Sequence, residues 1–439
     1  MRRVDELCDE FPDVPRAVVI KTDVLREGVK FTPVALKIGR WAIPEFLPWD
    51  REVHKDYSAI ENNLVSENWA WLPHSMTFPE GITAKVVYDF VRHHTSPYEI
   101  RQHDDGSLWL FSEEEPLTEL RFEKRPEWLS RRLENGRPMA SIFVLSSPDR
   151  LLGFPIRFCA HYRPEDICRF CCLNPVGKNI AKGDGYHDVI MSGEAAARSF
   201  SAALEETGIR HITLTGGTVR DQSKEAGIYA DVVQRLSRVR YETRANVAVQ
   251  VMSTALDDDG QERLQEAGVD EVCFNMEVWE ARLWPQIVPG KHRHVGRTAW
   301  MQRLCRAVER FGRGRVLCQF VVGVEMVSGG FATYAEAIDS VVTGLEWCAH
   351  NGIQPRTHIW CNTPGSLYEP GKVPPTEYFL TVAREHHRLL EKYGMYFPRE
   401  ARPPYSVACH RCGYLSPDAD FQWLLRADKP AAYTREQAG

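Results

Sequence analysis

Residues 211–218 read HITLTGGT, a short apolar run with β-branched side chains that ends in two glycines. This pattern predicts a buried β-strand followed by a turn. The segment before it, residues 193–208, is rich in alanine, has helical periodicity and stops at Gly208, so it predicts a helix. The same alternation of strand and helix extends along the chain from about residue 150.

Five further strands and five further helices are predicted around this unit. The strands are expected at 152–158, 246–252, 271–275, 316–322 and 356–361, and the helices at 229–241, 258–267, 298–312, 333–351 and 375–393. Such alternation indicates an α/β protein with parallel strands and right-handed crossovers. An open doubly wound sheet and a partial or full barrel both satisfy the pattern, and both place an active site at the carboxyl ends of the strands.

The composition excludes several classes of protein. The 439 residues are 43% hydrophobic and 26% charged, as in ordinary globular proteins. The net charge of -6 provides no positive field for nucleic acid, so we expect no nucleic-acid partner. No apolar run approaches the roughly 20 residues that span a bilayer, and the N-terminus lacks the apolar segment of a secretory signal. These features predict a cytoplasmic protein without a membrane partner.

The chain divides into three parts that differ in composition and sequence pattern. Residues 1–150 contain short apolar runs and a predicted β-hairpin at 98–111 with a turn at Gly106, and we expect a small α+β accessory module there. Residues 151–365 hold most of the alternating units. Residues 366–439 contain the last helix and a tail with two cysteines.

Three cysteines follow the first predicted strand of the series within a short loop: Cys159, Cys168 and Cys171. The chain has twelve cysteines, and in a reducing compartment clustered cysteines more often bind metal or perform redox chemistry than form disulfides. Two residues between Cys168 and Cys171 allow both sulfurs to face one metal centre. The adjacent Cys172 is a rival for Cys171, but only the Cys168–Cys171 pair keeps this spacing with Phe170 inside it.

Two kinds of metal site are compatible with these cysteines. A structural zinc site would combine Cys168 and Cys171 with Cys409 and Cys412 of the tail. An iron–sulfur cluster with three cysteine ligands and one open iron would use Cys159, Cys168 and Cys171 instead.

The cysteine triad and the Gly-Gly turn one βα unit later together resemble the radical S-adenosylmethionine superfamily over about residues 150–365. The resemblance implies a partial (β/α)6 barrel of the TIM type with a [4Fe–4S] cluster on Cys159, Cys168 and Cys171. The open iron of such a cluster chelates S-adenosylmethionine. Eight residues separate Cys159 from Cys168, whereas the usual spacing is three.

Further residues match the cofactor-binding motifs of this superfamily. The resemblance places Phe170 beside the adenine and the Gly216, Gly217 and Thr218 motif at the methionine amino group. It also places Asn275 and Glu277 at the ribose and methionine moieties, Val321 toward the adenine, and Glu325 at the end of the motif that follows the fifth strand. The segment around 275–316 is similar to the biotin-synthase-like and hydrogenase-cofactor-maturation-like branches.

The resemblance implies that a reductant such as flavodoxin or ferredoxin supplies an electron, and that a 5′-deoxyadenosyl radical then modifies a small biosynthetic substrate. Transfer of a 3-amino-3-carboxypropyl group from S-adenosylmethionine is an alternative within this class. A zinc-stabilised binding protein without catalysis is the alternative outside it.

Two other groups of residues are candidates for binding. Residues 291–294, with Arg293, form a basic segment that as a whole would hold an anionic substrate or the carboxylate of S-adenosylmethionine, although a solvated loop is the better explanation for any single charge there. Cys409 and Cys412 would bind a second metal or cluster, with Cys361 as a further ligand.

Overall fold

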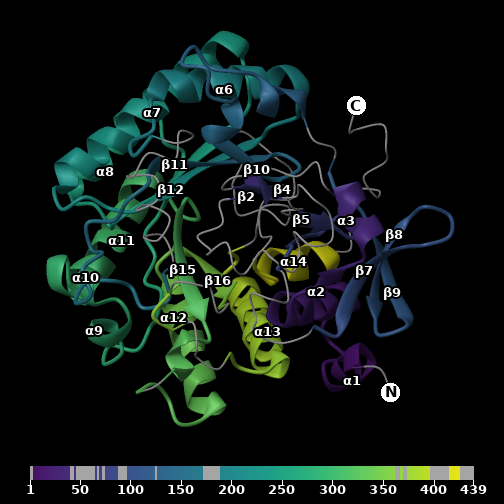
Figure 1. The fold of residues 1–439 in the computed structure, drawn as a ribbon. Coiled ribbons are helices and arrows are strands. Elements are labelled where there is room, and N and C mark those ends of the chain that lie inside the picture. Colours follow the sequence, from purple (N-terminus) through teal and green to yellow (C-terminus); the bar gives the residue numbers. More distant parts are fainter. Residues whose placement is uncertain are drawn as a thin grey trace.

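A curved sheet of seven strands lies at the centre of the molecule (Figure 1). The structure is a computed structural model. It describes residues 3–39, 44–45, 65–66, 69–71, 75–87, 96–123, 126–171, 188–327, 329–360, 366–368, 373–395 and 415–425. The strands are β10 (Phe143–Ser147), β11 (Arg150–Ile156), β12 (His211–Gly216), β13 (Ala248–Met252), β14 (Glu271–Cys273), β15 (Val316–Val322) and β16 (Gln354–Ile359).

The strands lie in the sheet in the order of the sequence. Strand β10 is antiparallel to β11, and every later neighbour pairs in parallel. Because each βα unit adds its strand beside the previous one, the sheet curls into a partial barrel, which confirms the predicted α/β fold class. The carboxyl ends of the parallel strands therefore meet along one edge.

One helix follows each parallel strand and covers the outside of the sheet, as Figure 1 shows. These helices are α6 (Gly193–Glu206), α7 (Gln222–Thr243), α8 (Asp258–Glu266), α11 (Arg297–Phe311), α12 (Tyr334–His350) and α13 (Thr376–Lys392). Helix α7 begins well before the predicted residue 229, because the Asp221 side chain accepts a hydrogen bond from the Lys224 N–H (3.1 Å) and caps the helix. The capping box predicted at Thr333 and Glu336 is present at the start of α12.

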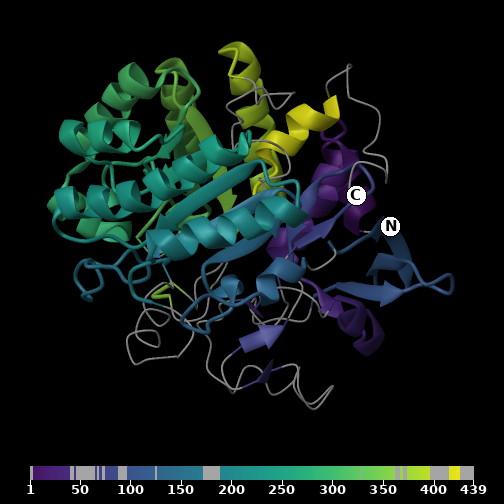
Figure 2. The same ribbon diagram turned by 90° about the horizontal axis from the view of Figure 1, so that it is seen from above.

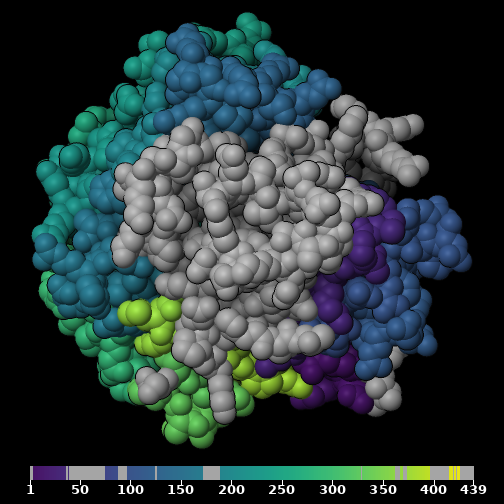
Figure 3. All heavy atoms as spheres, in the orientation of Figure 1, coloured from purple at the N-terminus to yellow at the C-terminus, as the bar shows by residue number. Residues whose placement is uncertain are grey.

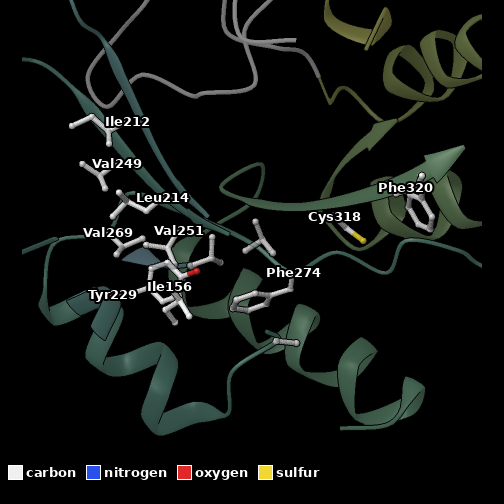
Figure 4. Close-up of a cluster of buried hydrophobic side chains, with 14 of the residues drawn as sticks. Ile156, Ile212, Leu214, Tyr229, Val249, Val251, Val269, Phe274, Cys318 and Phe320 are labelled. Carbon is white, nitrogen blue, oxygen red and sulfur yellow. The ribbon is translucent and has the colours of Figure 1, made fainter. Parts of the chain in front are cut away.

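The barrel core lies between the sheet and these helices. Figure 4 shows Ile212 and Leu214 of β12 beside Val249 and Val251 of β13, with Tyr229 of α7 packed against them. All five side chains are fully buried. Burial of each Val, Leu or Ile contributes about 1.5–3 kcal/mol, so this layer holds the curved sheet and its strand ends in place.

The N-terminal residues form separate small sheets. Strands β1 (Lys30–Phe31), β7 (Tyr98–Gln102), β8 (Leu108–Ser112) and β9 (Glu115–Leu120) make one sheet, and the predicted hairpin is β7 with β8. Strands β2 (Pro44–Glu45), β3 (Val65–Ser66) and β4 (Trp69–Trp71) make a second, and β5 (Ser75–Thr77) with β6 (Thr83–Lys85) a third. Helices α1 (Arg3–Glu10), α2 (Arg16–Glu27) and α3 (Pro33–Gly39) complete this region.

The C-terminal residues join the N-terminal region to the barrel. Figure 2 shows the yellow C-terminal helices between the green barrel helices and the purple N-terminal helices. Helix α14 (Asp418–Leu425) buries Asp420, which forms an ion pair with Lys21 of α2. Both side chains are fully buried. The space-filling view in Figure 3 shows the green and teal surface of the barrel at the left and the purple and blue surface of the N-terminal region at the right.

The segment before α14 also lies along β16, the last strand of the sheet. The Ile359 N–H donates to the Leu415 carbonyl (3.4 Å), and the Thr357 N–H donates to the Asp418 carboxylate (3.2 Å). Arg356 contacts the same carboxylate (2.9 Å). In the part of the chain that the structure describes, no helix has both the length and the apolar composition that a membrane crossing requires.

Candidate active site

The cysteine loop, residues 159–171, follows β11 at the carboxyl edge of the sheet. The Ala160 N–H donates to the Thr218 carbonyl (2.8 Å), which joins the loop to the end of β12. The Cys171 N–H donates to the Cys168 carbonyl (2.9 Å), which closes a tight turn between these two cysteines. Cys159, Cys168 and Cys171 are all partly exposed, so the loop presents three thiols near one strand edge.

Two short helices hold the loop from the other side: α9 (Trp284–Ile287) and α10 (Pro289–His294). The Arg169 N–H donates to the Ile287 carbonyl, and the Gly290 N–H donates to the Asp166 carbonyl, both at 2.9 Å. A Cβ atom on Gly290 would lie 2.5 Å from the Asp166 carbonyl oxygen. This glycine therefore allows α10 to contact the backbone of the cysteine loop directly.

Gly216 and Gly217 lie where β12 meets the cysteine loop. A Cβ atom on Gly217 would lie 1.7 Å from the Phe158 carbonyl oxygen and 2.9 Å from the Cys159 Cα. A Cβ atom on Gly216 would lie 2.3 Å from the Ile156 carbonyl oxygen. Only glycine permits this approach of backbone to backbone. The predicted Gly-Gly motif and the first predicted cysteine ligand are thus in direct contact.

Thr218 binds a buried carboxylate that the sequence analysis did not identify. The Thr218 hydroxyl donates to Glu225 of α7, and the same carboxylate accepts the N–H groups of Val219 (3.2 Å) and Thr254 (3.0 Å). Glu225 is fully buried, and this burial raises the pKa of its carboxyl group. Glu225 therefore ties together the ends of β12 and β13. An acidic residue in the first turn of a helix is common, so its position in the sequence provided no distinctive signal.

Asn275 and Glu277 follow β14 and are brought beside β15. The Gln319 N–H donates to the Asn275 side chain (3.2 Å). The Val321 N–H donates to the Glu277 carbonyl (2.8 Å). Glu277 has a φ of 67°, an unusual backbone conformation for a residue other than glycine. The structure therefore brings three predicted site residues together, with one of them in a strained conformation of the kind that occurs at functional sites.

Lys291 of α10 contacts both of these residues. Its ammonium donates to the Asn275 carbonyl (2.8 Å) and to the Glu277 carboxylate (2.6 Å), and it lies 4.6 Å from the centre of the Trp300 ring. Burial alone would lower the pKa of Lys291, but the Glu277 and Cys168 charges raise it above its usual value. Lys291 is therefore a cation of the basic segment that lies mostly buried at the strand ends.

Arg293, the residue predicted from that segment, has a different environment. Its guanidinium pairs with Asp166 of the cysteine loop, and His294 contacts the same carboxylate (3.2 Å). The His294 ring also stacks on that of His161 (4.9 Å between centroids). The Arg293 side chain is half exposed. In the structure it fastens α10 to the loop, and its contact with S-adenosylmethionine stays a prediction.

Glu325 also has partners within the protein. It lies in a short 3-10 helix, η4 (Val324–Met326), where its carboxylate accepts the Gly323 N–H (3.0 Å) and the Tyr378 hydroxyl of α13. Glu325 is 1% exposed, and burial raises the pKa of its carboxyl group to about 7. These contacts stabilise the turn after β15, and a role of Glu325 toward the cofactor stays a prediction.

The buried carboxyl group of Glu325 predicts a pH dependence of stability. Between pH 4.5, the usual pKa, and about 7, the native state keeps a proton that the unfolded chain has lost. Rising pH therefore lowers the free energy of unfolding through this window. Glu325→Gln removes this loss, so its stability relative to the wild type should rise by about 3 kcal/mol across the window.

Urea unfolding of both proteins between pH 5 and 8 measures this difference. Glu309→Gln, at an exposed position of α11, is the control. Its difference from the wild type in the free energy of unfolding should not change with pH. A Glu325→Gln difference that does not change with pH would contradict the prediction.

The three thiols have the chemistry of ligands for a soft metal centre. Burial raises the pKa of Cys168 to about 12 and raises that of Cys159, although the Thr218 N–H opposes the rise at Cys159. Thiols in such surroundings become thiolates when a metal supplies positive charge. Phe170 lies between Cys168 and Cys171 and packs partly buried against the barrel core.

A single metal ion and an iron–sulfur cluster place different demands on the spacing of their thiolate ligands. Among the described residues, no three His, Cys, Asp or Glu side chains converge closely enough to hold one metal ion. Thiolates around one tetrahedral zinc lie about 3.8 Å apart, given a Zn–S distance of about 2.3 Å. The ligands of an iron–sulfur cluster lie further apart, because each binds a different iron. Cys172, Cys361, Cys409 and Cys412 lie outside the described residues.

Comparison with known proteins gives distant relatives, and no family model matches the chain. Bacteriochlorophyllide c C-7(1)-hydroxylase from Chlorobaculum limnaeum is 23% identical over 331 residues, which cover 73% of this chain and 77% of the hydroxylase.

Solved structures with a similar fold match this chain with low TM-scores. A radical SAM methyltransferase from Sphaerobacter thermophilus is 17% identical with a TM-score of 0.39, over 73% of this chain and 82% of that chain. Methylornithine synthase is 15% identical with a TM-score of 0.39, over 56% of this chain and 64% of that chain. Coproporphyrinogen III oxidase from Escherichia coli is 12% identical with a TM-score of 0.33, over 56% and 54%. This chain thus spans less than two thirds of the length of methylornithine synthase and of coproporphyrinogen III oxidase.

Proposed function

We propose that this chain is an enzyme of the radical S-adenosylmethionine superfamily, on the basis of its strand-end motifs and its relatives. It acts on a small-molecule substrate and uses a [4Fe–4S] cluster held by Cys159, Cys168 and Cys171. The observation that carries the proposal is the contact between the Gly216–Gly217 turn and the backbone of Cys159. It brings a cysteine loop and a glycine turn together at the carboxyl edge of a partial barrel.

The protein's own residues prepare this site in three ways. The thiols of the cysteine loop provide the ligands, and the glycine turn exposes backbone for close approach of S-adenosylmethionine. Asn275 and Glu277, which follow β14, form a polar group with Lys291 of α10. When bound, the cluster supplies the electron that cleaves S-adenosylmethionine to methionine and a 5′-deoxyadenosyl radical. The surrounding protein holds the substrate close and excludes water.

The name of the relative from Chlorobaculum limnaeum supports the proposal of a small-molecule substrate. That protein is, by its name, a bacteriochlorophyllide c C-7(1)-hydroxylase. We propose accordingly that this chain removes hydrogen from a carbon atom of a small biosynthetic molecule. The electron would come from a low-potential protein such as flavodoxin or ferredoxin, in a cytoplasmic setting.

Anaerobic purification followed by iron and sulfide analysis tests the cluster. We expect stoichiometric iron and sulfide, and iron beyond one [4Fe–4S] cluster per chain would support a second site at Cys409 and Cys412. Incubation with S-adenosylmethionine and dithionite should then release methionine and 5′-deoxyadenosine. Methylthioadenosine would instead indicate 3-amino-3-carboxypropyl transfer. Stoichiometric zinc without sulfide would contradict the proposal and favour a zinc-stabilised binding protein.

A further inference from the structure

The cysteine loop makes one tight, exposed turn close to the thiols. The N–H groups of Asp166 and Ile167 both donate to the Arg163 carbonyl, at 2.9 and 3.0 Å. A turn closed from residue i to i+4 advances about 6 Å, and one further residue adds at most about 3.8 Å, so the Cα atom of Arg163 lies within about 10 Å of that of Cys168. The first three residues of this arginine turn, residues 163–166, are exposed. Among the described residues, the Arg163 side chain has no hydrogen-bond or ion-pair partner.

Two more guanidinium groups bind to the arginine turn. Arg169 donates to the Pro164 carbonyl (2.8 Å). Arg293 of α10 donates to the Glu165 carbonyl (3.2 Å). Of the two acidic residues in the turn, Asp166 is buried and paired with Arg293, whereas Glu165 is exposed. The exposed charge of the arginine turn is therefore mainly positive.

Two further exposed cations, Arg220 and Lys224, lie where β12 meets the cysteine loop. The Thr218 carbonyl accepts the Ala160 N–H of the loop (2.8 Å), and Arg220 is two residues after Thr218. Two residues span at most about 7 Å, so Arg220 lies close to the start of the loop. Asp221, the acidic residue between the two cations, caps α7. In the described part of the chain, neither cation has a side-chain partner.

The charge and the shape of this region favour an acidic protein as its partner. The whole chain has a net charge of -6, so exposed cations around the cysteine loop make a local field of the opposite sign. Such a field attracts a partner of negative charge and raises its rate of association. Figure 1 shows α10, which carries Arg293, at the left edge of the molecule. Small ligands bind in concave pockets, whereas the arginine turn is exposed at the surface, where a protein can contact it.

We propose that the basic surface, formed by the arginine turn with Arg220 and Lys224, is the docking site of an acidic one-electron carrier protein. This inference rests on the proposed function, in which the cluster receives one electron before S-adenosylmethionine is cleaved. The carrier loses this electron and the cluster gains it, and no proton or other group is transferred. Carboxylates of the carrier pair with Arg163, which brings the carrier to the exposed side of the cysteine loop. Electron carriers contact their partners through small interfaces, so a few charged pairs contribute strongly.

The test is the dissociation constant of the complex between the iron–sulfur-loaded full chain and a carrier, measured by isothermal titration calorimetry at low ionic strength. The carriers are a purified flavodoxin and, separately, a purified ferredoxin, both of net negative charge. Arg163→Glu should raise the dissociation constant about tenfold, because repulsion replaces attraction at the centre of the surface. Glu165→Lys should lower it. Both changes should nearly vanish at about 0.5 M salt, where exposed charges are screened.

The chain offers a matched control in Arg238. This residue is also exposed and, among the described residues, without a side-chain partner, and Arg238→Glu changes the net charge as Arg163→Glu does. Arg238 lies near the C-terminal end of α7, whereas the N-terminal end of this helix follows the carboxyl end of β12. Arg238→Glu should therefore leave the dissociation constant close to that of the wild type. Dithionite, a small reductant that needs no docking surface, should reduce the cluster to the same extent in every variant.

The opposite signs keep the test decisive. If Arg163→Glu fails to hold a cluster, Glu165→Lys still decides, because damage to the loop does not tighten binding. An unchanged dissociation constant in a fully loaded Arg163→Glu protein, or an equal loss of binding in Arg238→Glu, would overturn the inference. A loaded wild-type chain that binds neither carrier would overturn it as well. A wild-type chain that lacks iron and sulfide would instead overturn the proposed function, so the two failures are distinguishable.

Discussion

Cys168→Ser is expected to abolish the iron–sulfur cluster and with it the cleavage of S-adenosylmethionine. Burial raises the pKa of the Cys168 thiol to about 12, and the Cys168 carbonyl closes the turn to Cys171. A serine hydroxyl keeps the shape of the loop but does not provide the soft thiolate that iron requires. Loss of a residue that merely supports a ligand reduces affinity or activity by about 10–100-fold, so loss of a ligand should exceed about 100-fold.

Iron, sulfide and 5′-deoxyadenosine per chain measure this effect. Cys305→Ser is the matched control, because Cys305 is a partly exposed cysteine of α11 that lies outside the proposed ligand set. It should keep the iron content and the activity. A Cys168→Ser protein with normal iron and sulfide would show that the cluster uses other cysteines.

Gly217→Ala is expected to disrupt the cysteine loop although it adds only one methyl group. The new Cβ would lie 1.7 Å from the Phe158 carbonyl oxygen and 2.5 Å from the Phe158 carbonyl carbon, and both are backbone atoms. A flexible side chain can rotate away from such a contact, whereas backbone at a strand end cannot. We expect a loss of about 3 kcal/mol in the free energy of unfolding, or more, together with loss of the cluster.

Gly208→Ala separates this clash from the general effect of replacing glycine. A Cβ atom on Gly208 would meet nothing within 4 Å, and its φ is not in the left-handed region. This variant should leave the cluster intact and should stabilise the chain by at most about 1 kcal/mol. Chemical denaturation with iron analysis measures both variants. Equal stability of the two would contradict the close approach at Gly217.

The sequence predicts the barrel well, because its strands and helices repeat a regular pattern that burial enforces. The six predicted βα units are present, with shifted ends where a polar cap such as Asp221 starts a helix earlier than its apolar residues indicate. The cysteine loop and the Gly-Gly turn are also found from sequence, since both place unusual residues directly after strands.

The remaining contacts of the site depend on the tertiary structure. Glu225 and Lys291 are common residue types, and only the approach of α7 and α10 to the strand ends shows that Glu225 is buried and Lys291 mostly so. The charge of Arg293 predicts a contact with an anionic ligand, whereas in the structure its guanidinium pairs with Asp166 of the cysteine loop. Neighbouring residues of one helix point in different directions, so the sequence of a basic segment does not indicate which cation faces inward.

The buried ion pair between Lys21 and Asp420 joins residues 399 positions apart in the chain. During synthesis from the N-terminus, α2 emerges long before its partner, so the Lys21 charge has to stay in water until α14 has been made. Removing one member of a buried pair costs about 3–5 kcal/mol, so α2 gains its final packing only after α14 has been made. The barrel strands are therefore made before this ion pair can form, and α14 then fixes α2 in place.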